Sequence, residues 1–246
     1  MMSGSTASDH RAQRRVLVTG ATSGIGLGIA RAFAADAAQV YATGATDAEV
    51  ASAAATDSAI AFSRLDVRDA ATVSSWVTGL GPLDVVVNCA GIIRRGQEHD
   101  PEAFAQVIDI NLTGTMRVCA AARDGLKARR GCIVNTASML SFFGGGLVPG
   151  YSASKGGVAQ LTKSLAIAYA ADGIRVNAVA PGWIATPLTQ ALQDDPQRSG
   201  PILARTPLAR WGTPQDVAGP VLFLASSAAA FVTGAVLPVD GGYLIA

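Results

Sequence analysis

The sequence predicts an α/β fold in which a doubly wound parallel sheet of about seven strands carries helices on both faces of a single domain. Three observations predict this fold. Short β-branched runs alternate with longer alanine-rich stretches along the chain. Several of the short runs are apolar at successive positions, as parallel strands that are covered on both faces must be. The chain has 246 residues, half of them hydrophobic, which is enough for one large core.

The expected strands are short runs rich in valine and isoleucine. In chain order they are VLVT (16–19), VYAT (40–43), IAFSRL (60–65), DVVVN (84–88), CIVNT (132–136), RVNAV (175–179) and AVLPV (235–239). The expected helices lie between them, at 25–35, 70–80, 101–127, 152–171 and 214–225. This alternation implies right-handed crossovers. The last helix has a defined start, since Thr213 can cap it, Pro214 suits its first position and Asp216 stands where a capping-box acid would.

Two segments fall outside this alternation. Residues 1–14 are small, polar and basic, without the apolar core of a signal peptide, so we expect a disordered tail on a cytoplasmic protein whose folded domain covers 15–246. Residues 183–213 follow a strand, and we expect them to form a substrate-loop insertion at the carboxyl edge of the sheet, where ligands bind. The uncharged stretch 217–239 contains prolines and polar residues, which favours a buried helix, loop and strand over a membrane span.

Charge and composition exclude several classes of partner. The chain has 19 Lys and Arg against 18 Asp and Glu, which argues against nucleic acid or an anionic membrane as the main partner. Its 3 cysteines show neither metal spacing nor a disulfide pattern and fit a reducing compartment. His10 and His99 lack partners at ligand spacing, so no metal site is expected.

The first strand runs into a glycine-rich turn, TGATSGIG (19–26), with the pattern G-x-x-x-G-x-G. Gly20 permits a tight exit from the strand, Gly24 lets backbone approach a pyrophosphate, and Gly26 lets the following helix pack closely on the strand. A lone glycine turn can also be free of ligand. The strand before it and the helix after it favour a Rossmann-type dinucleotide site, and the missing lysine of a P-loop disfavours an NTPase.

The end of the second strand bears on the choice of dinucleotide. Gly44 stands there, followed by Ala45 and Thr46, so neither the acid typical of NAD sites nor the arginine typical of NADP sites is present. Ser23 occupies a position from which a basic residue could have bound a 2′-phosphate. We therefore expect NAD rather than NADP. At the end of the third strand, Asp66 and Val67 are candidates for binding the adenine, or Asp66 opens the next turn.

Tyr151 and Lys155 share one face of a predicted helix. At an effective dielectric constant of 20, a cation about 5 Å away lowers a tyrosine pKa of about 10 by roughly two units. Tyr151 is therefore expected to approach the phenolate near neutral pH and to exchange a proton with an alcohol or ketone. Ser138 follows a strand and could bind the substrate oxygen. Alone, such a pair is more often an exposed helical pair, but its combination with Ser138 and the glycine turn favours catalysis.

The chain resembles the short-chain dehydrogenases/reductases over nearly its whole length. The motifs that carry the resemblance are TGATSGIG (19–26), NCAG (88–91), YSASK (151–155) and PGWIAT (181–186), with Asp66, Asn111 and Ser138. NCAG departs from the usual NNAG at Cys89. The resemblance implies that Ser138, Tyr151 and Lys155 are catalytic and that Asn111 holds a water that relays protons to Lys155. The residues predicted to bind the cofactor are Gly20, Ser23, Gly24, Ile25, Gly26, Gly44, Asp66, Val67, Asn88, Ala90, Gly91, Tyr151, Lys155, Pro181, Gly182, Ile184 and Thr186.

A finer resemblance is to the sugar-acid dehydrogenases of the 2-deoxy-D-gluconate 3-dehydrogenase type. It rests on AGIIRR (90–95), ASMLSF (137–142), VPGYSASK (148–155) and RWG (210–212). It implies a sugar-acid or polyol substrate and a place in carbohydrate metabolism. The family resemblance, with the small residues Gly156, Gly157, Ala159 and Ala166 of one helix, also implies a homotetramer.

Several residues are candidates for choosing the substrate. Arg94 and Arg95 could bind a substrate carboxylate, or be solvated loop arginines or a subunit contact. Met139 and Leu140 could line an apolar wall, or belong to the core. Trp183, with Trp211 at the other end of the insertion, could close over a ligand or anchor the loop.

The sequence thus predicts an NAD(P)-dependent enzyme that transfers a hydride between nicotinamide and a secondary alcohol or ketone. Two alternatives stay open. A 3-oxoacyl thioester reductase would need NADPH and a basic surface for its acyl carrier, which the near-neutral charge does not favour. A dinucleotide-sensing binding protein could dispense with the proton relay, whereas here all four relay positions are filled.

Overall fold

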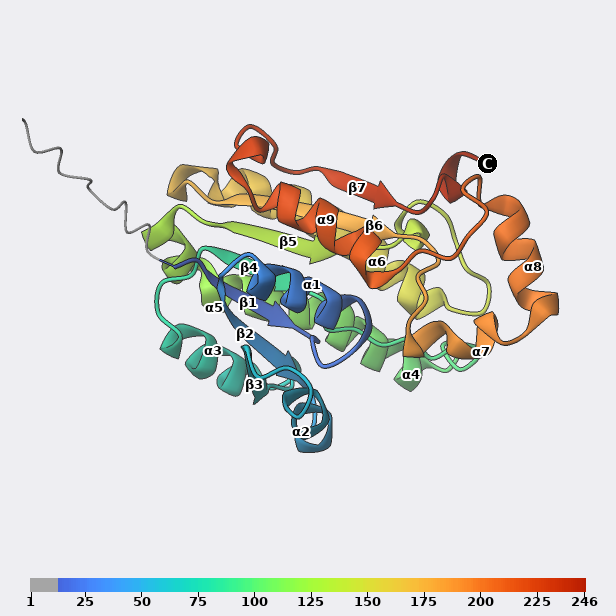
Figure 1. The fold of residues 1–246 in the computed structure, drawn as a ribbon, viewed down its shortest axis with the longest axis horizontal. Helices are drawn as coiled ribbons and strands as arrows, with labels where there is room; N and C mark the ends of the chain where they lie inside the picture. The colour runs from blue at the N-terminus through green and yellow to red at the C-terminus, as the bar shows by residue number, and fades with distance from the viewer. Residues whose placement is uncertain (1–12) are drawn as a thin grey trace, which may run out of the picture.

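The computed structural model describes residues 13–246. The tail predicted over 1–14 therefore lies, apart from its last two residues, outside the described residues, as does His10. A seven-stranded sheet forms the centre of the molecule, in the order β3-β2-β1-β4-β5-β6-β7 (Figure 1). All neighbouring strands are parallel. The predicted doubly wound, Rossmann-type fold is confirmed.

The strands coincide closely with the predicted runs. They are β1 (Arg15–Thr19), β2 (Gln39–Gly44), β3 (Ile60–Arg64), β4 (Val85–Asn88), β5 (Cys132–Thr136), β6 (Arg175–Pro181) and β7 (Val236–Val239). The central strand β4 is buried at every position. Its side chains alternate between two cores, with Val85 and Val87 on one face of the sheet and Val86 on the other. Continuous burial explains why three of its four residues are valine.

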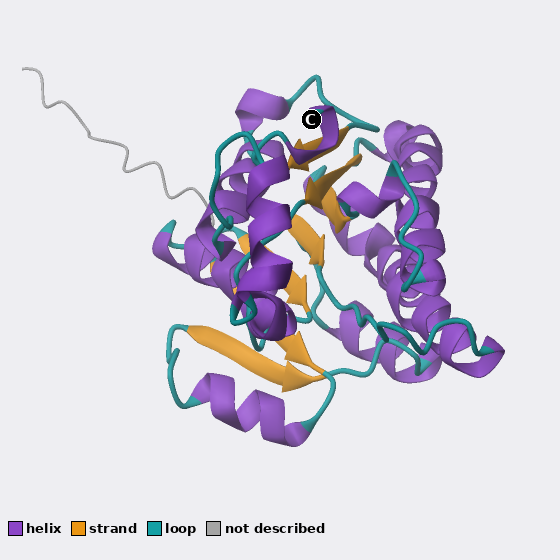
Figure 2. Ribbon diagram, turned by 90° about the vertical axis from the view of Figure 1, so that its right-hand side faces the viewer, coloured by secondary structure: helices purple, strands orange, loops and turns teal. Residues whose placement is uncertain are grey.

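Helices cover both faces of the sheet. They are α1 (Gly24–Ala35), α2 (Asp47–Ala54), α3 (Ala70–Gly79), α4 (Pro101–Ile108), α5 (Gly114–Arg129), α6 (Pro149–Tyr169), α7 (Gln190–Gln193), α8 (Pro196–Arg205) and α9 (Pro214–Leu224). One core lies under α1 and α9, and the other under α3, α5 and α6. Figure 2, seen from the end towards which the strands of Figure 1 point, shows the twisted sheet between these two layers.

The helix predicted over 101–127 is interrupted. α4 ends at Ile108, a π-helical turn follows at Asp109–Thr113, and α5 begins at Gly114. Asn111, inside this turn, is completely buried and hydrogen-bonds the backbone of Ile92. Single π-helical turns within helices often mark functional sites. Because of this interruption, the orientation of the Asn111 side chain depends on its tertiary contacts and does not follow from the periodicity of the helix.

The predicted insertion lies between β6 and α9 and contains α7 and α8. It extends beyond the carboxyl ends of the strands (Figure 1). The predicted start of α9 is confirmed, because Thr213 and Asp216 form a reciprocal capping box. Among residues 13–246, no helix is long and apolar enough to cross a membrane.

Candidate active site

The turn after β1 is pressed against the loop that follows β4. Gly20 has a φ of +62°, and a Cβ there would lie 2.6 Å from the backbone nitrogen of Ala90. Gly24 has a φ of +55°, and a Cβ at Gly26 would collide with the carbonyl oxygen of Gly20. Glycine removes both the strain and the collisions. The amino end of α1 therefore lines a cavity directly, as a site for a pyrophosphate requires.

Three cavities lie along the carboxyl edge of the sheet, each sharing lining residues with the next. The β2 cavity, of about 300 Å³, is lined by Gly44 and Asp66 among others. The central cavity, of about 280 Å³, is lined by Gly24 and Lys155. The α8 cavity, of about 360 Å³, is bordered by α7 and α8. Tyr151 lines both the central and the α8 cavity, so it stands at their junction.

Nearly all predicted cofactor-binding residues line one of these cavities. The β2 cavity has Gly20, Ser23, Gly44, Asp66, Val67, Ala90 and Gly91. The central cavity has Gly24, Ile25, Gly26, Tyr151, Lys155 and Thr186. The α8 cavity has Pro181, Gly182 and Ile184, together with the predicted substrate residues Arg95, Met139, Leu140 and Trp183. Asn88 lines none of the three, because its side chain is buried and donates a hydrogen bond to Asn135 at 2.9 Å, joining β4 to β5.

Two predicted residues have a different setting from the one expected. Arg94 lines the β2 cavity and not the α8 cavity, so it lies apart from the other predicted substrate residues, and its role towards the substrate stays a prediction. The chain turns between Arg94 and Arg95, which sends the two side chains to different cavities. The Asp66 carboxylate accepts hydrogen bonds from the backbone and guanidinium of Arg68, at 3.0 and 2.6 Å, and these bonds lower its pKa. Asp66 thus opens the next turn while also lining the β2 cavity.

Ser138, Tyr151 and Lys155 come together from two elements. Ser138 follows β5 and caps a short 3-10 turn, Met139–Ser141. Helix α6 begins at Pro149, which places Tyr151 in its first turn and Lys155 one turn later. Ser138 and Tyr151 both line the α8 cavity, and the Ser138 hydroxyl is close enough to lower the pKa of Tyr151. The spatial grouping of these three side chains is therefore as the sequence predicts.

The electrostatics of this group differ from the expectation. Burial raises the pKa of Tyr151 above its ordinary value, and the neighbouring Ser138 hydroxyl opposes this rise. The Lys155 ammonium donates to the carbonyl oxygen of Thr136 at 2.6 Å and lies 5.6 Å from the centre of the Tyr151 ring. Burial lowers the pKa of Lys155 to about 8. In the chain by itself, burial outweighs the interactions that lower the pKa of Tyr151. A phenolate near neutral pH stays a prediction for the enzyme with its cofactor bound.

Asn111 connects the loop after β4 to helix α6. Its side-chain nitrogen donates to the Ile92 carbonyl at 3.0 Å and to the Ser154 hydroxyl at 3.1 Å. Its side-chain oxygen accepts from the Ile92 nitrogen at 2.8 Å. These bonds hold the cofactor side of the cleft against the catalytic helix. The water relay implied by the family resemblance stays a prediction.

Glu98 is a residue of this site that the sequence did not single out. It is only 1% exposed, and its two carboxylate oxygens accept from the backbone nitrogens of Arg94 and Tyr151, each at 2.7 Å. It therefore fixes the first turn of α6 to the loop after β4. Nothing in the sequence separates it from its exposed acidic neighbour Asp100, so local pattern could not have found it.

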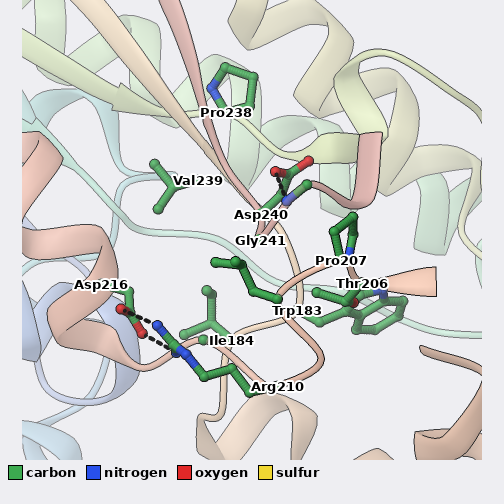
Figure 3. A pocket seen from close by; sticks show the side chains of 13 residues that line it. Trp183, Ile184, Thr206, Pro207, Arg210, Asp216, Pro238, Val239, Asp240 and Gly241 are labelled. Carbon is green, nitrogen blue, oxygen red and sulfur yellow. Dashed lines mark hydrogen bonds and ion pairs between the residues drawn. The ribbon is translucent and has the colours of Figure 1, made fainter. Parts of the chain in front are cut away.

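A fourth cavity, of about 470 Å³, lies on the other side of Trp183 (Figure 3). Its charged groups are engaged, since Arg210 pairs with Asp216 at 2.7 Å. Trp183 packs edge-on against Trp211, with ring centres 5.8 Å apart, and lines the α8 cavity as well. Trp211 donates to the Ser199 hydroxyl of α8 at 2.9 Å. The anchoring interpretation therefore fits Trp211, while Trp183 is a wall between two cavities.

Comparisons with known proteins agree with this geometry. A family model described as "Enoyl-(Acyl carrier protein) reductase" matches residues 20–244. The chain is 42% identical to 2-dehydro-3-deoxy-D-gluconate 5-dehydrogenase of Bacillus subtilis, over 94% of each chain. A structure described as a 2-deoxy-D-gluconate 3-dehydrogenase from Agrobacterium tumefaciens, with bound NADP, superposes with a TM-score of 0.84 at 42% identity, covering 95% of this chain and 97% of that one.

A second similar structure is that of a gluconate 5-dehydrogenase from Burkholderia cenocepacia, in complex with NADP and tartrate. It superposes with a TM-score of 0.89 at 35% identity, covering 95% of this chain and 96% of that one. The match of the family model to most of the chain, the identities and the arrangement of the three cavities agree. The chain belongs to the short-chain dehydrogenase/reductase family and is an NAD(P)-dependent oxidoreductase that acts on CH–OH groups.

Proposed function

We propose that this enzyme interconverts a secondary alcohol and a ketone on a sugar acid or related polyol, with Tyr151 as its proton-transferring group. The observation that carries the proposal is the position of Tyr151 at the junction of the central and α8 cavities, with Ser138 lining the α8 cavity beside it. A bound nicotinamide supplies or accepts the hydride. Every other part of the reaction falls to side chains of this chain.

In the direction of reduction, Tyr151 donates its phenolic proton to the carbonyl oxygen of the substrate while Ser138 donates a hydrogen bond to the same oxygen. The nearby Lys155 ammonium stabilises the phenolate that remains. Oxidation uses the same groups in reverse. Glu98 and Asn111 act as positioning residues, because each ties α6 to the loop after β4.

The chain fits a dinucleotide along the β2 and central cavities. Positive φ angles at Gly20 and Gly24 bring backbone to the amino end of α1, where a pyrophosphate is stabilised by the helix dipole. Thr186 and Lys155 line the nicotinamide side in this arrangement, and Val67 the adenine side. Gly20 and Gly91 line both the β2 cavity and the central cavity, so the two cavities meet at these residues.

We infer a preference for NAD over NADP from Glu49. The backbone nitrogens of Ala45 and Thr46, directly after β2, both donate to one carboxylate oxygen of Glu49, at 2.9 and 3.0 Å. Glu49 also lines the β2 cavity. A 2′-phosphate at this end of the cavity would meet a carboxylate and two amides that are already bonded. The nearby cations of Arg64 and Arg68 are paired with aspartates, so neither offsets this repulsion.

The substrate class is supported by the cavity next to Tyr151 and by the similar proteins. The described lining of the α8 cavity includes two arginines and no acidic residue, which suits an anionic substrate. The similar proteins reported above are named or described as dehydrogenases of sugar acids, and one is bound to tartrate. A 3-oxoacyl thioester would bring a neutral acyl chain with no use for two cations.

The test is a comparison of NADH and NADPH in the reduction of keto-sugar acids, ketoses and 3-oxoacyl thioesters. We expect the highest kcat/KM with NADH and a keto-sugar acid. Preference for NADPH would contradict the role given to Glu49, and preference for a thioester would contradict the substrate class. Tight NADH binding without turnover of any of these compounds would favour a dinucleotide-sensing protein.

We further propose a homotetramer in the cytoplasm. Large apolar side chains remain exposed in the single chain, among them Ile167 on α6 at 81% and Phe223 on α9 at 45%. A Cβ at Gly156 would meet no described atom within 4 Å, so this part of α6 could accept a neighbouring chain. Free thiols at Cys89, Cys119 and Cys132 fit a reducing compartment. Light scattering tests the assembly, and a monomer would contradict it.

A further inference from the structure

Two guanidinium groups border the α8 cavity, and neither is in an ion pair with a described residue. Arg95 and Arg198 both line it, and the lining residues described include no Asp or Glu. Neither arginine forms an ion pair within residues 13–246, whereas other arginines of the surface do, such as Arg31 with Asp57. An unbalanced pair of cations beside a reaction centre is an arrangement that attracts an anion.

We infer that Arg95 and Arg198 together form a subsite for the carboxylate of the substrate. The subsite holds the acid group at the α8 side of the cavity while Ser138 and Tyr151 act on the oxygen of another carbon. This inference rests on the proposed function, because it names the residues that would distinguish a sugar acid from an uncharged polyol. Arg198 was not singled out from the sequence, where it is one charged residue in a polar stretch.

The backbone around Arg95 is fixed on both sides. The nitrogen of Arg94 donates to the buried Glu98 carboxylate at 2.7 Å, and the nitrogen of Gly96 donates to the carbonyl of Leu147 at 2.8 Å. The same Glu98 carboxylate holds the Tyr151 nitrogen. Glu98 therefore fixes the backbone next to Arg95 and the backbone of Tyr151 relative to each other. This sets the distance between Arg95 and the reaction centre.

Arg198 comes from a different element, helix α8, which is itself anchored. Ser199, which directly follows Arg198 in the helix, accepts a hydrogen bond from the ring nitrogen of Trp211 at 2.9 Å. At the end of the helix, the Arg205 guanidinium lies 4.3 Å from the centre of the Tyr243 ring. These two contacts, one beside Arg198 and one at the last residue of α8, fix the helix. They therefore keep the Arg198 side chain at the cavity.

The two cations affect each other. Both guanidinium groups line the same cavity; burial and the positive charge of Arg198 lower the pKa of Arg95, while the Glu98 carboxylate opposes this. A carboxylate between them removes this repulsion and can accept two parallel hydrogen bonds from a guanidinium. A hydroxyl or carbonyl of a neutral sugar offers no comparable compensation. The subsite should therefore discriminate between substrates by charge.

The experiment compares a keto-sugar acid with the uncharged ketose of the same carbon chain, using NADH and the variants R198M, R198K and R95M. R129Q is the matched control, since Arg129 lies at the end of α5 and lines none of the three cavities. We expect R198M and R95M to raise the KM for the keto acid by about 10- to 100-fold. The KM for the ketose should change less than about twofold, and R198K should restore part of the loss.

Calorimetric titration with tartrate provides a readout that does not depend on turnover. We expect R198M with bound NADH to bind tartrate at least about tenfold more weakly than the unmodified enzyme. Two results would overturn the proposed carboxylate subsite. One is equal affinity for tartrate in R198M and the unmodified enzyme, and the other is an equal increase in KM for the keto acid and the ketose in the arginine variants. An unmodified enzyme that reduces only the ketose would contradict the proposed sugar-acid substrate instead, and the titration would then decide on the arginine pair alone.

Discussion

At the scale of single residues, the surroundings of each ionisable side chain set its chemistry. Lys155 is 4% exposed, and its ammonium has one hydrogen-bond acceptor among the described residues, the Thr136 carbonyl. Burial disfavours the charged form and brings the pKa to about 8, below the ordinary 10.5. The cation that supports Tyr151 is thus kept at a cost to the folded state, as functional groups often are.

Replacing Lys155 with methionine should therefore stabilise the cofactor-free protein at pH 7. Below pH 8 the lysine is charged in both the folded and unfolded chain, and folding bears the full cost of burying it. Between pH 8 and 10.5 the unfolded chain binds more protons than the folded one, so the stability of the unmodified protein rises with pH. We expect K155M to be more stable by up to about 3 kcal/mol at pH 7, with the difference shrinking above pH 8.

Thermal unfolding of K155M and the unmodified protein between pH 7 and 9.5 checks this expectation. K155M should lose turnover at every pH, while its advantage in Tm becomes smaller as the pH rises. A stability difference that does not depend on pH, or a K155M protein that is less stable at pH 7, would contradict the account of Lys155.

At the scale of elements, the first turn of α6 depends on a residue from another segment. Glu98 precedes α4, yet its carboxylate holds the backbone nitrogens of Arg94 and Tyr151. A buried backbone nitrogen left without an acceptor costs about 1–3 kcal/mol. Glu98 is thus the joint between the loop after β4 and the catalytic helix.

We expect E98A to lower the free energy of unfolding by about 1–3 kcal/mol, because two partly buried backbone nitrogens lose their acceptor. E98Q retains one side-chain oxygen and should lose less. Urea unfolding measures both, with E102A as the control, since Glu102 is exposed. E98A should also reduce kcat while leaving NADH affinity nearly unchanged, which a purely structural role would not predict. An E98A protein as stable and as active as E102A would contradict the role of Glu98 in positioning the first turn of α6.

The strands and most helices could be predicted from the sequence, whereas α2, the two helices of the insertion and the interruption after α4 could not. Strands such as β4 are rich in valine because both of their faces are covered, and this pattern is visible in the chain. Helix α2 went unpredicted although Thr46 and Glu49 form a capping box that the sequence displays. The π-helical turn around Asn111 has no local signal, because it depends on bonds to Ile92 and Ser154.

The residues of the candidate site also fall into two groups, those that the sequence could place and those that it could not. Gly20, Ser138, Tyr151 and Lys155 sit in motifs with fixed spacing, so the sequence could place them. Glu98 and Arg198 reach the site through tertiary packing, so no spacing indicated them. Arg94 and Arg95 look alike in the sequence, and only the path of the backbone shows that they line different cavities.

At the scale of the whole molecule, the cofactor cleft joins segments from β1 to β6, so a bound dinucleotide should stabilise the entire domain. Saturation at 100 times Kd adds about 2.7 kcal/mol, or roughly 5–10 °C in Tm for a domain of this size. We expect a larger rise with NADH than with NADPH at equal concentration. E49Q should narrow this gap, because it removes the charge beside the 2′ position. Equal shifts for both cofactors in the unmodified protein would contradict the role of Glu49.

The central claim is that Tyr151 transfers the proton, and turnover by Y151F tests it most directly. The account predicts that kcat falls by about 10²–10⁴-fold for every substrate that the enzyme accepts, while NADH affinity stays within about threefold. Y169F is the matched control, since Tyr169 lies at the other end of α6 and lines none of the three cavities, and it should retain activity. Turnover by Y151F within a few-fold of the unmodified enzyme would contradict the account.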